Sequence, residues 1–153
     1  MDKQQLKDCH QRIKPFIHDT PVLTSRLIDK MGNANGTFIL KPGQYKGALK
    51  LGKHKGRYDA LVQSEKAKFV GWRDNNADRL LTMLGQLYTD VTGLNLHTTS
   101  FINEIEKIGA YSAGCQVIQD DKEFLIFMEI IKKSAELYGD HFTYTLFEEF
   151  DLY

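Results

Sequence analysis

The sequence predicts an α/β fold of three layers, in which helices cover both faces of a mostly parallel sheet. An irregular N-terminal helix-and-loop segment is expected to precede this sheet. From residue 67 onward, short apolar runs with strand character alternate with stretches whose apolar residues recur at helical spacing. Strands that alternate with helices normally pair in parallel through right-handed crossovers. All 3 prolines fall within the first 42 residues, which places the irregular structure early.

Length and composition predict one domain over residues 1–153. The chain has 42% hydrophobic and 26% charged residues, which is typical of a folded protein with its own core. We expect the irregular segment 1–45 to pack on an alternating core over residues 67–150. No apolar run reaches the ~18 residues of a membrane span. The 2 cysteines lack metal-ligand spacing, which indicates reduced thiols, a cytoplasmic location and no evident metal site.

The first half of the chain gives fewer regular elements than the second. We expect a helix over 3–14 that Pro15 stops, an extended segment over 20–25, a short helix over 26–31 and a strand over 37–40. The stretch 46–66 is ambiguous, because its leucines fit a helix whereas its glycines equally permit a loop or a hairpin.

The second half alternates strand and helix. The expected elements are, in order, a strand over 68–72, a helix over 75–91, a strand over 94–98, a helix from Ser100, a strand over 115–118, a helix over 121–138 and a strand over 142–147. Asp120 and Glu123 form a capping-box pattern before the last helix, and Gly139 marks its end.

This last helix is apolar nearly all round over Phe124–Ile131. A crossover helix needs one apolar face, so the helix is either buried on two sides or carries an association surface. One functional hypothesis is therefore a non-enzymatic interaction module, which would use the helix 121–138 to form a homo-oligomer or to bind a protein partner.

The charges sum to zero but are unevenly distributed. Residues 41–68 carry 8 lysines and arginines against 2 acids, whereas residues 115–153 carry 3 cations against 9 acids. Within the stretch 46–57, glycines and lysines alternate in a way that could cradle a phosphate. A binder of phosphate or nucleic acid is thus a further hypothesis, although zero net charge argues against nucleic acid as a partner. A lysine among other cations could instead form a Schiff base.

Several segments resemble the pyridoxal-phosphate (PLP) enzymes of the tryptophan-synthase-β fold type. The segment Leu6–Arg26 is similar to the N-terminal segment of serine racemases and threonine dehydratases. The similarity is strong over about residues 6–30, moderate to residue 50 and weak beyond it. Matches to the family's motif around its Schiff-base lysine are Gln44, Gly47, Ala48 and Lys50. Asn75 matches the family's asparagine that contacts the cofactor ring.

The resemblance implies that Lys50 is the catalytic residue holding PLP, with Asn75 as a second cofactor contact. It further implies a lyase or isomerase that acts on a small hydroxy amino acid. The sequence has about half the family's length. The resemblance therefore implies a truncated or degenerate relative of the N-terminal half, with little or no activity as an isolated chain.

Overall fold

The computed structural model describes residues 36–74, 83–98 and 112–147. These residues form seven strands and one helix: β1 (Phe38–Leu40), β2 (Gly43–His54), β3 (Tyr58–Gln63), β4 (Gly71–Arg73), β5 (Leu96–Thr98), β6 (Gln116–Ile118), α2 (Asp121–Tyr138) and β7 (His141–Leu146). The elements expected over 3–14, 20–25 and 26–31, and the helix from Ser100, lie outside the described residues. In the part of the chain that is described, no helix is long and apolar enough to cross a membrane.

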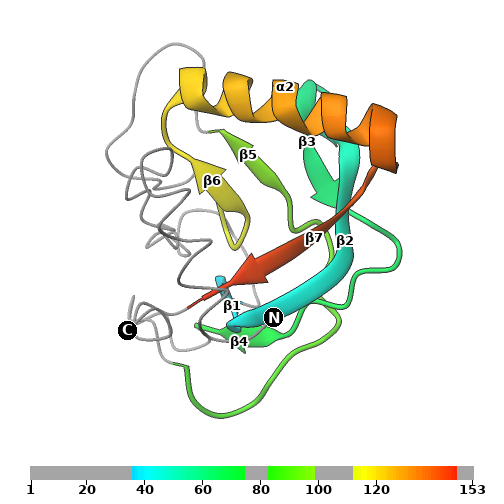
Figure 1. The fold of residues 1–153 in the computed structure, drawn as a ribbon. Coiled ribbons are helices and arrows are strands. Elements are labelled where there is room, and N and C mark those ends of the chain that lie inside the picture. Colours follow the sequence, from blue (N-terminus) through cyan, green and yellow to red (C-terminus); the bar gives the residue numbers. More distant parts are fainter. Residues whose placement is uncertain (1–35, 75–82, 99–111, 148–153) are drawn as a thin grey trace.

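The described strands form two sheets (Figure 1). β1 and β4 make a small antiparallel sheet, and a five-stranded sheet has the order β6-β5-β3-β2-β7. Within the larger sheet, β5 and β6 pair in parallel and the other neighbours pair antiparallel. The sheet is curled into a half-barrel, and α2 lies across it. The expected three-layer α/β fold with a mostly parallel sheet is therefore wrong.

The ambiguous stretch 46–66 explains much of this correction. It forms an antiparallel hairpin of β2 and β3, which occupies the centre of the larger sheet. Lys55 and Gly56 adopt φ angles of 49° and 71° in the connecting turn. Two positive φ angles in succession are typical of tight hairpin turns, and a tight turn joins only antiparallel strands. The alternation of strands and helices that predicts a parallel sheet begins at residue 67, after this hairpin, and so does not indicate that the hairpin forms.

The prediction of a helix over 75–91 is also wrong for residues 83–91, the part that the structure describes. Residues 83–91 are not helical, and residues 75–82 lie outside the described ranges. The backbone of Tyr88 instead exchanges two hydrogen bonds with Gly71, at N···O distances of 2.8 and 3.1 Å. Leu84 is 80% exposed whereas Val91 is buried in the core. The apolar residues of this segment thus recur at helical spacing without sharing one buried face.

Other local predictions are confirmed. β1, β5, β6 and β7 fall within one or two residues of the expected strands, while β4 begins later than the expected 68–72 strand. α2 spans the expected 121–138, and the Asp120 carboxylate accepts hydrogen bonds from the backbone N–H groups of Lys122 and Glu123. Gly139 follows the helix with a φ of 91°, a conformation that glycine adopts without strain.

Two groups of buried side chains fill the structure. The larger one joins the five-stranded sheet to β1 and the loops around it, and contains Phe38, Leu40, Ala48, Leu49, Leu61, Phe69, Val91 and Leu94. The smaller group lies under α2 and contains Ala60, Phe124 and Met128. At Gly71, strand β4 approaches β1 so closely that a Cβ atom on this residue would lie 2.1 Å from the Ile39 carbonyl oxygen. Only glycine fits there.

Candidate functional site

Lys50 lies within strand β2, opposite Val62 of β3 and His141 of β7. Its Nζ atom is 2.7 Å from Glu65 Oε2, and about a third of its side chain is exposed. The hydrogen bond and the charge of Glu65 raise the pKa of Lys50. The amine is therefore held in its protonated form, whereas an amine must be neutral to attack an aldehyde.

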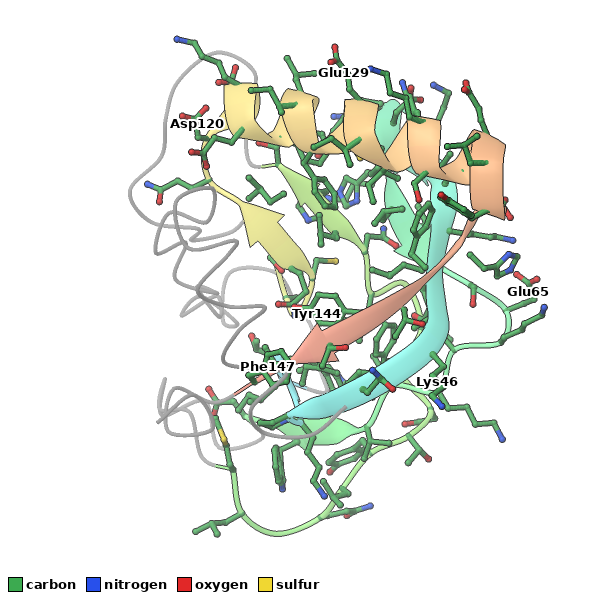
Figure 2. The ribbon with its side chains drawn as sticks, viewed as in Figure 1. Lys46, Glu65, Asp120, Glu129, Tyr144 and Phe147 are labelled. Atoms are coloured by element: carbon green, nitrogen blue, oxygen red, sulfur yellow. The ribbon has the colours of Figure 1, made fainter. Side chains whose placement is uncertain are left out.

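Glu65 connects Lys50 to a chain of charged groups at the edge of β7. His141 Nε2 lies 3.6 Å from Glu65 Oε1, and His141 Nδ1 lies 2.9 Å from Asp140 Oδ1. The hydrogen bond from Lys50 lowers the pKa of Glu65 to about 2. These side chains are exposed to solvent, and Figure 2 shows Glu65 at the periphery of the molecule. An exposed network of this kind contributes little to stability.

The second residue of the proposed cofactor pair, Asn75, lies outside the described residues. The neighbouring Asp74 is buried, and its backbone N–H donates to the Thr37 carbonyl across 3.0 Å. Lys50 is positioned by a strand and not by the N-terminus of a helix. The contact of Asn75 with a cofactor stays a prediction.

The glycine-rich stretch 46–57 uses its backbone groups within the hairpin. The Gly47 N–H donates to Thr143 Oγ1 across 3.3 Å, and the Gly56 N–H donates to the Lys53 carbonyl across 3.4 Å. Gly52 pairs with Ala60 in the ladder. A phosphate cradle needs N–H groups that point toward the ligand, whereas these glycines serve turns and strand pairing.

Two lysines of the same stretch are already paired with acids. Lys50 contacts Glu65, and Lys53 Nζ lies 2.9 Å from Asp59 Oδ1. Lys132 of α2 approaches the other oxygen of Asp59 at 2.6 Å. These bonds to Lys132 and Lys53 lower the pKa of Asp59. Asp59 and Glu65 are the two acids already counted within residues 41–68, so these pairs occupy two of the eight cations and leave the excess of positive charge in that stretch unchanged.

An open groove of about 660 Å³ borders Lys50 and Lys53. Its far wall is the loop 89–95, which the Gln63 side chain holds by donating to the Val91 carbonyl and accepting from the Leu94 N–H, both across 3.0 Å. The groove is wide, so it lacks the enclosure of a small-molecule site. Its two lysines are ion-paired with Glu65 and Asp59. Within the described ranges, no three His, Cys, Asp or Glu side chains gather as metal ligands do.

A pair of stacked histidines lies inside the fold. The rings of His54 and His97 are 3.9 Å apart with an interplanar angle of 21°. His97 Nδ1 lies 2.7 Å from the Thr98 carbonyl, which fixes the proton on that nitrogen. Burial lowers the pKa of both histidines, that of His54 to about 4. The two neutral rings pack together inside the fold and are too buried to offer an exposed group for catalysis.

Helix α2 is anchored by one face. Phe124 and Met128 are 1% and 3% exposed, and they pack on Ala60 of β3. The Phe124 ring meets the Tyr58 ring edge-on, with centroids 6.3 Å apart. Lys132 adds the ion pair to Asp59 described above. These contacts fix which side of the helix faces solvent.

The opposite side of α2 is apolar and exposed. Ile126 is 60% exposed, Ile130 62% and Leu137 73%. These three residues are spaced by 4 and 7 positions, so they lie on one side of the helix. Leu125 and Tyr138, which lie away from this row around the helix, are also exposed. Figure 2 shows Glu129, which lies next to Ile130 in the sequence, pointing away from the sheet. We call the row of Ile126, Ile130, Lys133 and Leu137 the outer stripe of α2.

Comparison of the chain with family models, with curated proteins and with solved structures gave no match. The arrangement of its side chains is therefore the basis for any statement about function.

The sequence alone indicates that α2 has more apolar residues than one packed face needs, but it does not indicate the partners of Lys50. Glu65 and His141 lie 15 and 91 positions further along the chain. Only the pairing of β2 with β3 and β7 brings them to Lys50. No local pattern in the sequence encodes that pairing. The stacking of His54 on His97 depends on the same non-local contacts.

Proposed function

We propose that this protein is a non-enzymatic protein-interaction module that binds through the outer stripe of α2. The observation that carries the proposal is the contrast between the two sides of one helix. Phe124 and Met128 are buried, whereas Ile126 and Ile130 are more than half exposed. A helix that packs on a sheet needs apolar residues on one side only, so the second side requires another explanation.

Covering the outer stripe would be favourable. Burial of apolar surface contributes ~25 cal/mol per Å², and a large aliphatic side chain contributes about 1.5–3 kcal/mol when it becomes fully buried. Contiguous exposed apolar residues on a helix are typical of surfaces that bind other proteins. Lys133 lies within the stripe, and Glu129 lies beside it. A mixed apolar and charged surface of this kind favours a partner with matching charges over lipid.

The enzymatic hypothesis has less support from the described residues. Lys50 is paired with Glu65, which favours the protonated amine over an imine. The hypothesis of a phosphate or nucleic-acid binder is weakened by the ion pairs of Lys50 and Lys53. Both hypotheses stay predictions, and the interaction module is the function that the geometry supports best.

Site-specific photo-crosslinking tests the proposal. A photoreactive amino acid placed at Ile126 or Ile130 should form a covalent adduct with one discrete protein in the expressing cells, identified by mass spectrometry. The matched control is the same amino acid at Leu84, which is 80% exposed but lies outside α2. If the two α2 positions give no more adduct than position 84, the proposal is wrong.

A further inference from the structure

The outer stripe has the spacing of a helix-pairing seam. Its members Ile126, Ile130, Lys133 and Leu137 are separated by 4, 3 and 4 positions. Alternating separations of three and four residues define the a and d positions of a heptad, which meet a second helix along one seam. The outer stripe therefore suits a partner that presents a helix of the same spacing.

Resting on the proposed function, we infer that the partner is a second copy of this chain, with the two α2 helices antiparallel about a twofold axis. In this register, Ile126 of each copy packs against Ile130 of the other. The four isoleucines form the centre of the contact, and Lys133 of each copy faces Glu123 of the other at its ends. A twofold contact requires a surface that complements itself. The isoleucines meet this requirement, whereas Leu137 of each copy faces residue 119, just before the other helix begins.

The charges beside the stripe and the isoleucines within it together select this register. Lys122 and Glu136 lie 14 positions apart, which is two heptads. In the antiparallel pair, Lys122 of each copy therefore lies next to Glu136 of the other, so two opposite-charge contacts form. One unfavourable contact remains, because Glu129 lies next to Glu129 at the axis. Sliding the helices by one heptad in one direction would place Glu129 against Glu136 twice, with no compensating cation. Sliding them in the other direction would place Lys122 against Glu129, but it would also place Ile126 against Glu123 in the seam.

The described residues around α2 leave this arrangement room. Figure 1 shows the described strands on one side of α2. Phe124 and Met128 are buried on that side, whereas the apolar residues of the outer stripe are exposed on the other. The sheets of two copies would therefore point away from the shared seam. An 18-residue helix is about 27 Å long, so one helix pair makes a small interface. Interfaces of this size are typical of weak complexes, and we expect a concentration-dependent dimer.

Sedimentation equilibrium of the purified full chain, from micromolar to near-millimolar concentration, tests the inference. The wild-type chain should change from monomer to dimer over this range. Ile130→Asp should weaken dimerisation at least tenfold, since it places two carboxylates at about the centre of the seam. Leu84→Asp is the matched control, because it adds the same charge at an exposed leucine outside α2, and it should leave the dimer unchanged.

A charge exchange tests the antiparallel register. Lys122→Glu and Glu136→Lys should each weaken the dimer by about three- to tenfold, since each variant creates two like-charge contacts. The double variant should restore the dimer to within about twofold of wild type, as expected for two opposite-charge contacts. Glu129→Gln should strengthen dimerisation, because it removes the repulsion at the axis. These positions are on the helix surface, so the variants are expected to fold.

Three results would overturn the inference: a monomer at every concentration, a double variant as weak as the single ones, or a Glu129→Gln variant that is no tighter. The photo-crosslinking experiment separates this failure from failure of the proposed function. An adduct of two copies supports both. An adduct with a different, identified protein overturns the inference about the second copy and leaves the interaction module in place.

Discussion

Tyr144 and Gln116 join the two edge strands of the five-stranded sheet. The Tyr144 hydroxyl, on β7, donates a hydrogen bond to Gln116 Oε1, on β6, across 3.2 Å. Figure 2 shows Tyr144 between these two strands. β6 and β7 are the first and last strands in the sheet order, with three strands between them. The bond therefore holds the sheet in its curled form.

Replacing Tyr144 by phenylalanine should reduce the free energy of unfolding by about 1 kcal/mol, because it removes this hydrogen bond and leaves Gln116 without its donor. Urea denaturation measures the loss. Tyr138→Phe is the matched control, since Tyr138 is 84% exposed, and its stability should equal that of wild type. Equal stability of the two variants would contradict a role for the Tyr144 bond.

The same tyrosine predicts instability at high pH. Burial raises the pKa of Tyr144 to about 12, from an ordinary value of 10.0. Between these values the unfolded chain loses the phenolic proton while the folded chain keeps it, so stability should fall as pH rises from 10 toward 12. Tyr144→Phe should make this decline shallower. An unchanged slope would show that Tyr144 is not the group responsible.

At low pH, His54 should weaken the fold. Burial, with smaller effects from His97 and Lys55, lowers the pKa of His54 from 6.5 to about 4. Within this interval the unfolded chain binds a proton that the folded chain excludes, so the stabilisation present above pH 6.5 is lost as pH falls toward 4. Denaturation midpoints across this range should fall less for His54→Phe. Direct titration of His54 near 6.5 by NMR would refute this explanation.

The reactivity of Lys50 should depend on Glu65. Because Glu65 raises the pKa of Lys50, Glu65→Gln should increase the fraction of neutral amine at neutral pH. PLP followed by borohydride reduction should then label Lys50 faster in the variant than in wild type, as peptide mass spectrometry can measure. Lys53 serves as the internal control, since its acid partner is Asp59. Equal labelling of Lys50 in both proteins would oppose the proposed control by Glu65.

An absorption scan with PLP, without borohydride, tests the resemblance to PLP enzymes. If Lys50 is a Schiff-base lysine, PLP should give an imine absorption band in wild type that Lys50→Ala abolishes. Absence of the band, or its persistence in Lys50→Ala, would remove the assignment.

The two sides of α2 should respond differently to truncation. Phe124→Ala should cost about 3–5 kcal/mol, since it leaves a cavity against Ala60. Ile126→Ala should change stability by less than about 0.5 kcal/mol in the dilute chain, because Ile126 is 60% exposed. Thermal or urea unfolding at low protein concentration measures both. A large loss for Ile126→Ala would mean that this residue is buried in the monomer.

Local signals in the sequence predict some single elements well, although the helical spacing over residues 75–91 does not give a helix in residues 83–91. The helix 121–138 is predictable together with its cap, because the Asp120 carboxylate and Gly139 act on neighbouring backbone groups. Local sequence signals do not predict the fold class. Whether two strands run parallel depends on what joins them, and the glycine-rich stretch 46–66 is compatible by sequence with a helix, a loop or a hairpin. Once that stretch is a hairpin, the centre of the sheet is antiparallel.

The features of the candidate site also differ in how far the sequence alone predicts them. The apolar excess over Phe124–Ile131 is a property of consecutive residues, so the sequence alone can indicate an association surface. Which of these residues lie outward depends on Ala60 and Tyr58, which pack against the helix from β3. The surroundings of Lys50 depend on strand register, and the residue proposed to work with it, Asn75, lies outside the described part of the chain.

Helix α2 is also the covalent link between the two edge strands. Two residues separate it from β6, and two more separate it from β7. The sheet therefore cannot flatten unless the helix shifts on Ala60, and a molecule bound to the helix would resist that shift. Occupancy of the outer stripe should consequently slow amide hydrogen exchange in β6 and β7, although neither strand would touch the bound molecule.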